Sequence, residues 1–175
     1  MHLPIARKGE GGFTLAELLP VILIIGILGA IAAPAWLGFV EQQRINTARS
    51  DLHSHLRATQ TKAIQQRINY QMTLRMQGTQ AQIAVHPESA SLNNVVWQNL
   101  ADPIWIEGNT NFRGSVVNGT QYYRVRFTYQ GHPRELGTFR ILAKQNQSGK
   151  RRCITVSTLL GAMRLTDSDD SVCWP

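Results

Sequence analysis

The sequence lacks the residue groupings on which enzymes and metal sites depend. Its five histidines include one close pair, His53 and His55, but side chains two positions apart on a helix do not face each other. No Gly-x-Gly-x-x-Gly or Gly-Lys-Ser/Thr sequence predicts a phosphate-binding loop. Asp167, Asp169 and Asp170 lack the glycine and the distal glutamate of a calcium loop, so a solvated turn is expected there. We therefore expect no enzyme, no metal, no cofactor and no small-molecule substrate.

Charge is missing from a long stretch near the N-terminus. From Leu18 to Val40 there is no Asp, Glu, Lys or Arg. As a helix this stretch is about 35 Å long, which is enough to cross a bilayer. Arg7 and Lys8 precede it, and the excess of positive charge on the cytoplasmic side of such spans places the N-terminus in the cytoplasm. We expect one membrane span with the rest of the chain outside.

A single carboxylate stands at the front of this span. Glu17 directly precedes the charge-free stretch, and a carboxylate within a membrane costs about 2.5–3.5 kcal/mol on insertion scales. If the chain were cut between Gly12 and Phe13, the new amine of Phe13 would lie one helical turn from Glu17. Two alternatives are a secretory signal cleaved near Ala32-Ala33 and a plain anchor. The first leaves Glu17 unexplained, and the second explains neither Gly12-Phe13 nor Glu17.

The segment resembles the type IV prepilin signature, in which a prepilin peptidase cuts after the glycine. The resemblance implies cleavage between Gly12 and Phe13 and N-methylation of Phe13. It also implies that Glu17 pairs with the amine of its own Phe13 or that of a neighbouring subunit. Pro34 agrees with the family pattern, whereas Pro20 departs from it. Proline removes an N–H, so we expect a kink or local unwinding near Pro20.

The pattern divides the chain into four parts. Residues 1–12 are the predicted leader peptide, 13–40 the transmembrane and filament-core helix, 41–66 the amphipathic half of the same helix, and 67–175 a β-rich globular domain. Small or apolar residues recur at helical spacing along the third part. They are Ile45, Ala48, Leu52, Leu56, Thr59 and Ala63. This stripe needs a partner, which the globular domain must supply.

Short strands are expected after the helix. The clearest is Tyr122–Tyr129, where apolar and polar side chains alternate. A hairpin is expected around Gln77-Gly78, and Asn109–Gly114 is expected to be a loop. The other expected strands and short apolar pieces are Tyr70–Met76, Thr79–Val85, Val95–Gln98, Pro103–Ile106, Leu136–Ala143, Arg152–Leu159 and Ala162–Thr166. The predicted fold is α+β: a lollipop in which the outer half of a long N-terminal helix packs on antiparallel sheet.

Two cysteines, Cys153 and Cys173, fall in the part expected outside the membrane. An oxidising compartment favours a disulfide between them. It would close a loop of roughly 20 residues and contribute about 3 kcal/mol in the chain-entropy model. Its main effect would be to fix the C-terminal tail, which otherwise frays. Two free thiols remain the alternative.

A second resemblance lies near the C-terminus. Gly149–Ser157 followed by Gly161–Arg164 is similar to the C-terminal pattern of the GspH/FimT group, which comprises minor pilins and the H-type pseudopilin of type II secretion. In that group a basic strand with a cysteine precedes a Gly-Arg-x-Arg turn, and the first arginine of the turn is Ala162 here. Together the resemblances imply a subunit of a type II secretion system or of a type IV pilus. Its partners would be the prepilin peptidase, other pilin or pseudopilin subunits and the bacterial inner membrane, with the globular domain periplasmic or extracellular.

Basic residues suggest an alternative function. The formal net charge is +7, from 18 Lys+Arg and 11 Asp+Glu. Arginine presents a planar fork suited to phosphate, and a neighbouring Tyr122 can stack on bases. The expected anion contacts are Arg124 and Arg126 on one strand face, and Lys150, Arg151, Arg152 and Arg164 in the C-terminal strands. The alternative is therefore a DNA-binding minor pilin that acts in DNA uptake. A solvated basic face, or charges that meet acidic patches on neighbouring pilins, explains the same residues.

Overall fold

The computed structural model describes residues 14–100, 104–108, 111–143, 151–167 and 173. The predicted leader, with Gly12 and Phe13, lies outside the described residues, and so does Lys150. The chain divides into two compact units, the first ending at Phe39 and the second beginning at Val40.

The N-terminal element is α1, an α-helix that runs from Leu15 to Gln66. It contains Pro20 and Pro34, and the helix continues through both. Of the two effects expected at Pro20, a kink or local unwinding, the unwinding is therefore absent from α1. A proline inside a helix removes one i→i−4 hydrogen bond, and here the flanking turns remain helical without it.

The part of α1 that lies in the first unit exposes apolar side chains on all sides. All residues from Thr14 to Phe39 are exposed, and Ile31 and Leu37 each retain 69% of their accessible surface. By length and composition, α1 is the one helix in the described part of the chain able to cross a membrane.

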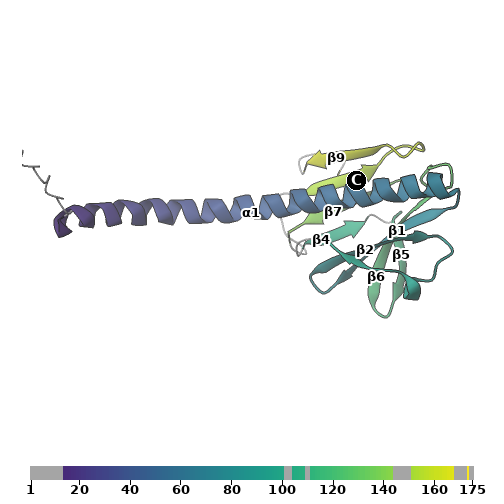
Figure 1. Cartoon of the computed structure of the whole chain (residues 1–175), viewed down its shortest axis with the longest axis horizontal. Helices are drawn as coiled ribbons and strands as arrows, with labels where there is room; N and C mark the ends of the chain where they lie inside the picture. Colours follow the sequence, from purple (N-terminus) through teal and green to yellow (C-terminus); the bar gives the residue numbers. More distant parts are fainter. Residues whose placement is uncertain (1–13, 101–103, 109–110, 144–150, 168–172, 174–175) are drawn as a thin grey trace, which may run out of the picture. The chain divides into compact units, whose positions relative to one another are not determined.

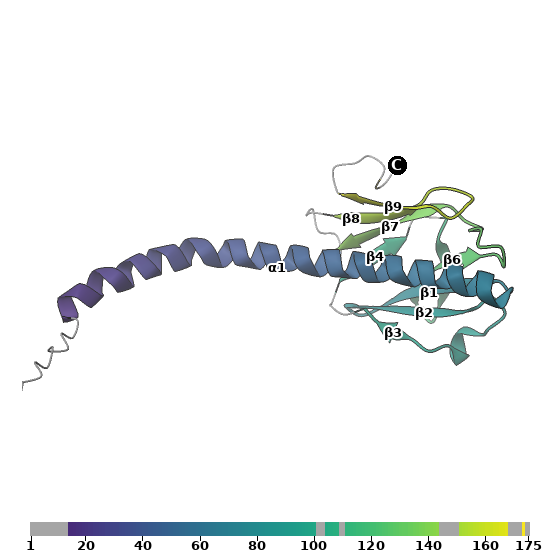
Figure 2. The ribbon, with the colours of Figure 1, turned by 45° about the horizontal axis from the view of Figure 1, so that its top comes forward.

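In the second unit, the rest of α1 buries one stripe. The prediction of this stripe is confirmed, because the buried residues of α1 are the six that the helical spacing selects. They are Ile45, Ala48, Leu52, Leu56, Thr59 and Ala63. The stripe continues into a core that also holds Met72 and Leu74 of one sheet and Phe139 and Ile154 of another. In Figures 1 and 2 this half of α1 lies across strands of both sheets.

Five antiparallel strands form the first sheet, in the order β3-β2-β1-β6-β5. They are β1 (Tyr70–Gln77), β2 (Gln80–Pro87), β3 (Gln98–Asn99), β5 (Arg113–Val117) and β6 (Thr120–Phe127). The expected hairpin at Gln77-Gly78 joins β1 to β2, and Gly78 has the positive φ that its turn requires. A short 3-10 helix, η1 (Leu92–Asn94), lies between β2 and β3.

Four antiparallel strands form the second sheet, in the order β4-β7-β8-β9. They are β4 (Trp105–Gly108), β7 (Gly137–Leu142), β8 (Arg152–Val156) and β9 (Met163–Asp167). The strands make two sheets because β6 has a partner on both edges: β1 on one and β5 on the other. The expected loop at Asn109–Gly114 ends early, since β5 begins at Arg113 and fills the second edge of β6. β7 therefore pairs with β4 and β8 instead.

Candidate functional sites: the helix start, the disulfide and the arginines

The first turn of α1 is closed by Thr14 and Glu17. The Thr14 backbone N–H donates to Glu17 Oε2 at 2.9 Å, and the Thr14 hydroxyl donates to the same oxygen at 2.8 Å. The Glu17 N–H lies 3.3 Å from the Thr14 hydroxyl oxygen. This reciprocal arrangement is a capping box, in which N-terminal N–H groups that lack a helical partner are satisfied by side chains.

The capping box gives Glu17 a partner, Thr14, besides the Phe13 amine expected from the sequence. The Thr-x-x-Glu spacing before an apolar run is itself the signature of a capping box and predicts this partner. Both hydrogen bonds that Thr14 donates go to Oε2 of Glu17, and neither goes to Oε1. Gly12 and Phe13 lie outside the described residues, so cleavage, N-methylation and pairing of Glu17 with the amine stay predictions.

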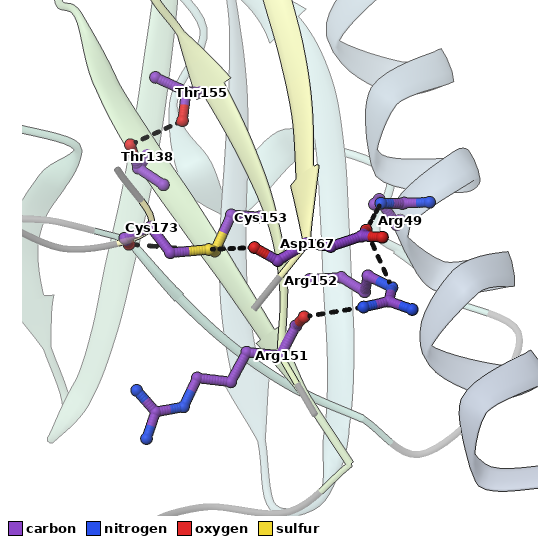
Figure 3. Close-up of a disulfide and its surroundings, with 8 residues drawn as sticks. All are labelled: Arg49, Thr138, Arg151, Arg152, Cys153, Thr155, Asp167 and Cys173. Carbon is purple, nitrogen blue, oxygen red and sulfur yellow. Dashed lines mark hydrogen bonds and ion pairs between the residues drawn. A yellow bond between two sulfur atoms is a disulfide. The ribbon is translucent and has the colours of Figure 1, made fainter. Parts of the chain in front are cut away.

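The structure joins Cys153 of β8 to Cys173 in a disulfide, with the two Cα atoms 5.7 Å apart. Both half-cystines are buried, Cys153 completely and Cys173 to 5% exposure. Figure 3 shows the bond on β8, on the side away from α1. The disulfide therefore fixes the end of the chain to the second sheet.

A polar clamp on the opposite side of β8 joins the sheet to α1. Asp167 of β9 accepts a hydrogen bond from Arg49 Nη1 at 2.9 Å and lies 3.3 Å from Arg152 Nε. Arg152 Nε also donates to Asn46 Oδ1 at 3.2 Å. Figure 3 shows Arg151 pointing away from this clamp. Arg152, predicted as an anion contact, instead holds the helix against β8 and β9.

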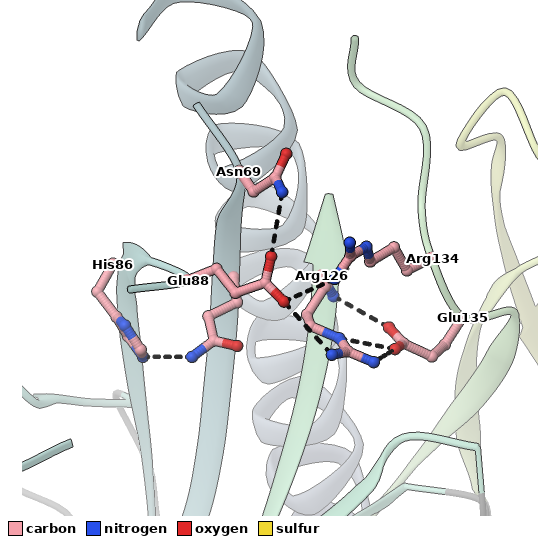
Figure 4. A network of polar contacts seen from close by, with 7 residues as sticks. Asn69, His86, Glu88, Arg126, Arg134 and Glu135 are labelled. Carbon is pink, nitrogen blue, oxygen red and sulfur yellow. Dashed lines mark hydrogen bonds and ion pairs between the residues drawn. The ribbon is translucent and has the colours of Figure 1, made fainter. Parts of the chain in front are cut away.

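A second arginine cluster lies on the first sheet. Arg126 of β6 donates through Nε to Glu135 Oε1 at 2.7 Å, and its Nη1 lies 3.4 Å from Glu88 Oε1. Arg134 pairs with the same Glu88 oxygen at 2.8 Å, and Asn69 donates to the other oxygen of Glu88. Figure 4 shows Arg126 between the two carboxylates. The hydrogen bond to Glu135 raises the pKa of Arg126, and the two glutamates balance its charge.

These contacts divide the predicted anion site. Arg124 and Arg126 belong to the first sheet, whereas Arg152 and Arg164 belong to the second. Arg126 and Arg152 are held by carboxylates of the same chain and are not free for phosphate. In the described ranges, Arg124, Arg151 and Arg164 form no ion pair, so a DNA contact through these three stays a prediction.

The expectation that Tyr122 stands open for base stacking is wrong. Its side chain is buried, at 9% exposure. Its hydroxyl accepts a hydrogen bond from Arg75 Nη1 at 3.4 Å, and its ring lies 6.0 Å from that of Trp97. The Arg75 guanidinium lies 4.0 Å from the Trp97 ring centroid. The segment before β3 thus covers this face of the first sheet, which strand alternation alone does not reveal.

His86 is a buried histidine that belongs neither to the helix start, nor to the disulfide, nor to the arginine contacts described above. Its Nδ1 lies 2.9 Å from the Pro87 carbonyl oxygen, so Nδ1 carries the proton, and Nε2 accepts from the Thr73 hydroxyl at 3.1 Å. Burial lowers the pKa of His86, which keeps the ring neutral. The described part of the chain contains no group of three or more His, Cys, Asp or Glu side chains able to hold a metal ion.

Comparisons with known proteins agree with this architecture. No protein-family model matches the chain. The Type II secretion system protein H of Xanthomonas campestris pv. campestris is 36% identical over 61 residues, which is 35% of this chain and 36% of that protein. The chain thus matches about a third of the length of this curated relative. The crystal structure of the type IV minor pilin FimU of Pseudomonas aeruginosa aligns with 78% of this chain and 99% of its own, at a TM-score of 0.53 and 16% identity. The chain therefore has the type IV pilin-like fold, with a long apolar N-terminal helix that continues onto antiparallel sheets, and about a third of its sequence is similar to an H-type secretion protein.

Proposed function

We propose that the chain is a minor subunit of a pilin-like filament, in a type II secretion system or a type IV pilus, and not an enzyme. This proposal rests on one observation, which is that the exposure of side chains changes along α1. Apart from Glu17, its residues up to Phe39 are uncharged and exposed, whereas its later residues bury one stripe in a folded core. A continuous apolar surface of that length is stable only in lipid or among other apolar helices. A subunit that waits in the inner membrane and then enters a filament meets both environments.

Before assembly, the span holds the subunit in the inner membrane. Arg7 and Lys8 favour a cytoplasmic N-terminus, and the Cys153–Cys173 disulfide suits a periplasmic second unit. The capping box lowers the cost of placing Glu17 at the edge of lipid, because one carboxylate oxygen already accepts two hydrogen bonds.

Cleavage after Gly12 by a prepilin peptidase then frees the amine of Phe13, which is N-methylated. Glu17 pairs with that amine, in its own or a neighbouring subunit, as the span leaves lipid. A charged pair in apolar surroundings is stable only if both members have partners for their hydrogen bonds. Gly26 and Gly29 are exposed on α1, and small residues of this kind allow membrane helices to approach one another closely.

Two substitutions in the full chain, produced in its own bacterium, test the proposal. Gly12→Leu should retain the leader, seen as a higher intact mass, whereas the neighbouring Gly11→Ala should mature normally. Glu17→Val should still be cleaved but should be depleted from sheared filaments. Normal maturation of Gly12→Leu would refute the cleavage site, and normal filament entry of Glu17→Val would refute the pairing.

A second candidate function is DNA binding through Arg124, Arg151 and Arg164, which form no ion pair in the described ranges. Binding of the detergent-solubilised full chain to duplex DNA over a salt series tests it. Contacts with phosphates release counterions, so the affinity should fall steeply as salt rises. The triple change of these arginines to glutamine should abolish it. Absence of binding at low salt would remove this candidate.

A further inference from the structure

Two aromatic residues lie together at one end of the charge-free stretch. Between Thr14 and Val40 the sequence contains Trp36 and Phe39 and no other aromatic residue. They are three positions apart on α1 and therefore on one side of it, and their ring centroids are 5.8 Å apart. Trp36 retains 66% of its accessible surface and Phe39 retains 54%. The pair thus faces the surroundings of the first unit.

Charge alone does not fix how deep the span lies in a bilayer. The stretch from Leu18 to Val40 is about 35 Å long as a helix, whereas the hydrocarbon core of a bilayer is about 30 Å thick. The stretch can therefore slide by about 5 Å while only uncharged residues remain in the core. With the topology proposed above, Glu17 favours a slide toward the cytoplasm, because a carboxylate is costly in lipid. Holding Glu17 at the edge of lipid requires a group that opposes this slide.

The aromatic pair meets this requirement by its position. Trp36 lies about 28 Å along α1 from Glu17, at 1.5 Å per residue, which is close to the thickness of the hydrocarbon core. Tryptophan prefers the membrane–water interface, because its ring is apolar and its N–H donates to polar groups. Deeper in the hydrocarbon that N–H would meet no acceptor. When Glu17 is at one edge of the hydrocarbon, Trp36 is therefore at the other.

The folded core of the same chain does not cover this pair. The first unit ends at Phe39, and the buried stripe of α1 begins only at Ile45. A filament offers other apolar helices to Trp36 and Phe39, but only after the subunit has left the membrane. Lipid is therefore the first occupant of this surface.

We propose that Trp36 and Phe39 bind the outer lipid–water interface of the inner membrane and thereby fix the depth of the span. The ester carbonyls and phosphates of the headgroup layer accept from the indole, and the adjoining acyl chains pack on both rings. This inference rests on the proposed function, because the subunit must wait in the membrane with its N-terminus in the cytoplasm. As a consequence, Glu17 is held at the cytoplasmic edge of lipid, close in sequence to the proposed cleavage site between Gly12 and Phe13.

Fluorescence quenching in vesicles measures the depth of Trp36. The full chain is placed in phosphatidylcholine vesicles whose acyl chains carry bromine either near the headgroup or near the methyl end. Subtracting the quenching of Trp36→Phe isolates Trp36 from the other tryptophans, and Trp36 should be quenched more by the shallow bromines. The matched control, Leu28→Trp with Trp36→Phe, puts the probe about 12 Å nearer the middle of the span. This control should be quenched more by the deep bromines.

Cysteine labelling tests whether the pair holds the span in place. Leu19→Cys puts a thiol about 3 Å along the helix from Glu17, on the apolar side, and the two native cysteines are joined in a disulfide. The vesicles for this test are prepared from the bacterium with the cytoplasmic face outward. In them, Trp36→Leu with Phe39→Leu should raise labelling by an impermeant maleimide several-fold, because the span slides toward the cytoplasm. Trp36→Tyr with Phe39→Tyr keeps interfacial rings and should leave labelling low.

The opposite results overturn the inference. They are quenching of Trp36 that is strongest with deep bromines or equal with both, labelling that does not rise in the leucine variant, and labelling that rises equally in the tyrosine variant. The phosphatidylcholine vesicles contain neither peptidase nor filament, so the depth measurement is independent of the proposed maturation. Quenching of neither Trp36 nor the Leu28→Trp control would refute the proposed membrane span itself. A deep Leu28→Trp probe with a misplaced Trp36 would refute the aromatic anchor alone.

Discussion

Removal of the disulfide should destabilise the second unit by about 3 kcal/mol. Cys153 and Cys173 are 20 positions apart, and closing a loop of that size removes about 3 kcal/mol of unfolded-state entropy in the chain-entropy model. Replacing both with alanine avoids placing a new hydroxyl at Cys153, which is fully buried. The folded state should keep its sheets, because the pairing of β8 with β7 and β9 does not depend on the bond.

Urea unfolding of the full chain in detergent, followed by tryptophan fluorescence, measures this effect. Since the cross-link acts largely on the unfolded chain, its loss should also raise the urea dependence of the unfolding free energy, as more surface is exposed. Reduced wild-type protein should match Cys153→Ala with Cys173→Ala. A loss below about 1 kcal/mol, or reduced protein that unfolds like the oxidised form, would show that the bond does not constrain the chain in this way.

Three further predictions concern the same unit. Leu52→Ala, at a fully buried position, should cost about 2–5 kcal/mol in urea unfolding, whereas the exposed Ser54→Ala should cost little; equal costs would contradict the packing of α1. Arg152→Ala should lower the free energy of unfolding more than Asp167→Asn does. Asp167 is 68% exposed, and ion pairs with an exposed partner contribute only about 0–1 kcal/mol. A larger loss for Asp167→Asn would contradict the role of Arg152 in holding α1 against the sheet. Burial lowers the pKa of His86, so the folded state binds fewer protons than the unfolded state. Its stability contribution is complete above the unfolded pKa, near 6.5, and is lost as pH falls through that value toward the folded pKa. Unfolding midpoints at pH 7.5 and pH 5 should therefore differ less in His86→Gln than in wild type. An unchanged difference would show that His86 is not the source of this pH dependence.

Regular patterns were predictable from the sequence. The spacing of Ile45, Leu52 and Leu56 identifies the buried side of α1 because helical periodicity and burial have the same cause. Similarly, Val125 and Phe127 are buried as strand alternation predicts. The two cysteines could be paired because the sequence contains no others.

Features that depend on contacts between distant segments were not predictable. Tyr122 belongs to the polar side of β6, yet Trp97 covers it. Arg126 is neutralised by Glu88 and Glu135, which lie in two different segments. The role of β5 was hidden because its residues carry no apolar alternation and only the free edge of β6 makes them a strand.

The pairing of the strands also determines the order in which the domain can form. β1 with β2, β5 with β6, and β8 with its neighbours are hairpins between consecutive strands, and such local contacts close quickly. The pairings of β1 with β6 and of β4 with β7 join segments far apart in the chain, so their loop-closure entropy makes them slow. α1 is synthesised first, but its buried stripe needs both sheets. During synthesis, the stripe must therefore remain unpartnered until nearly the whole chain has emerged, which makes this interval the one in which the chain is most open to aggregation and to chaperones.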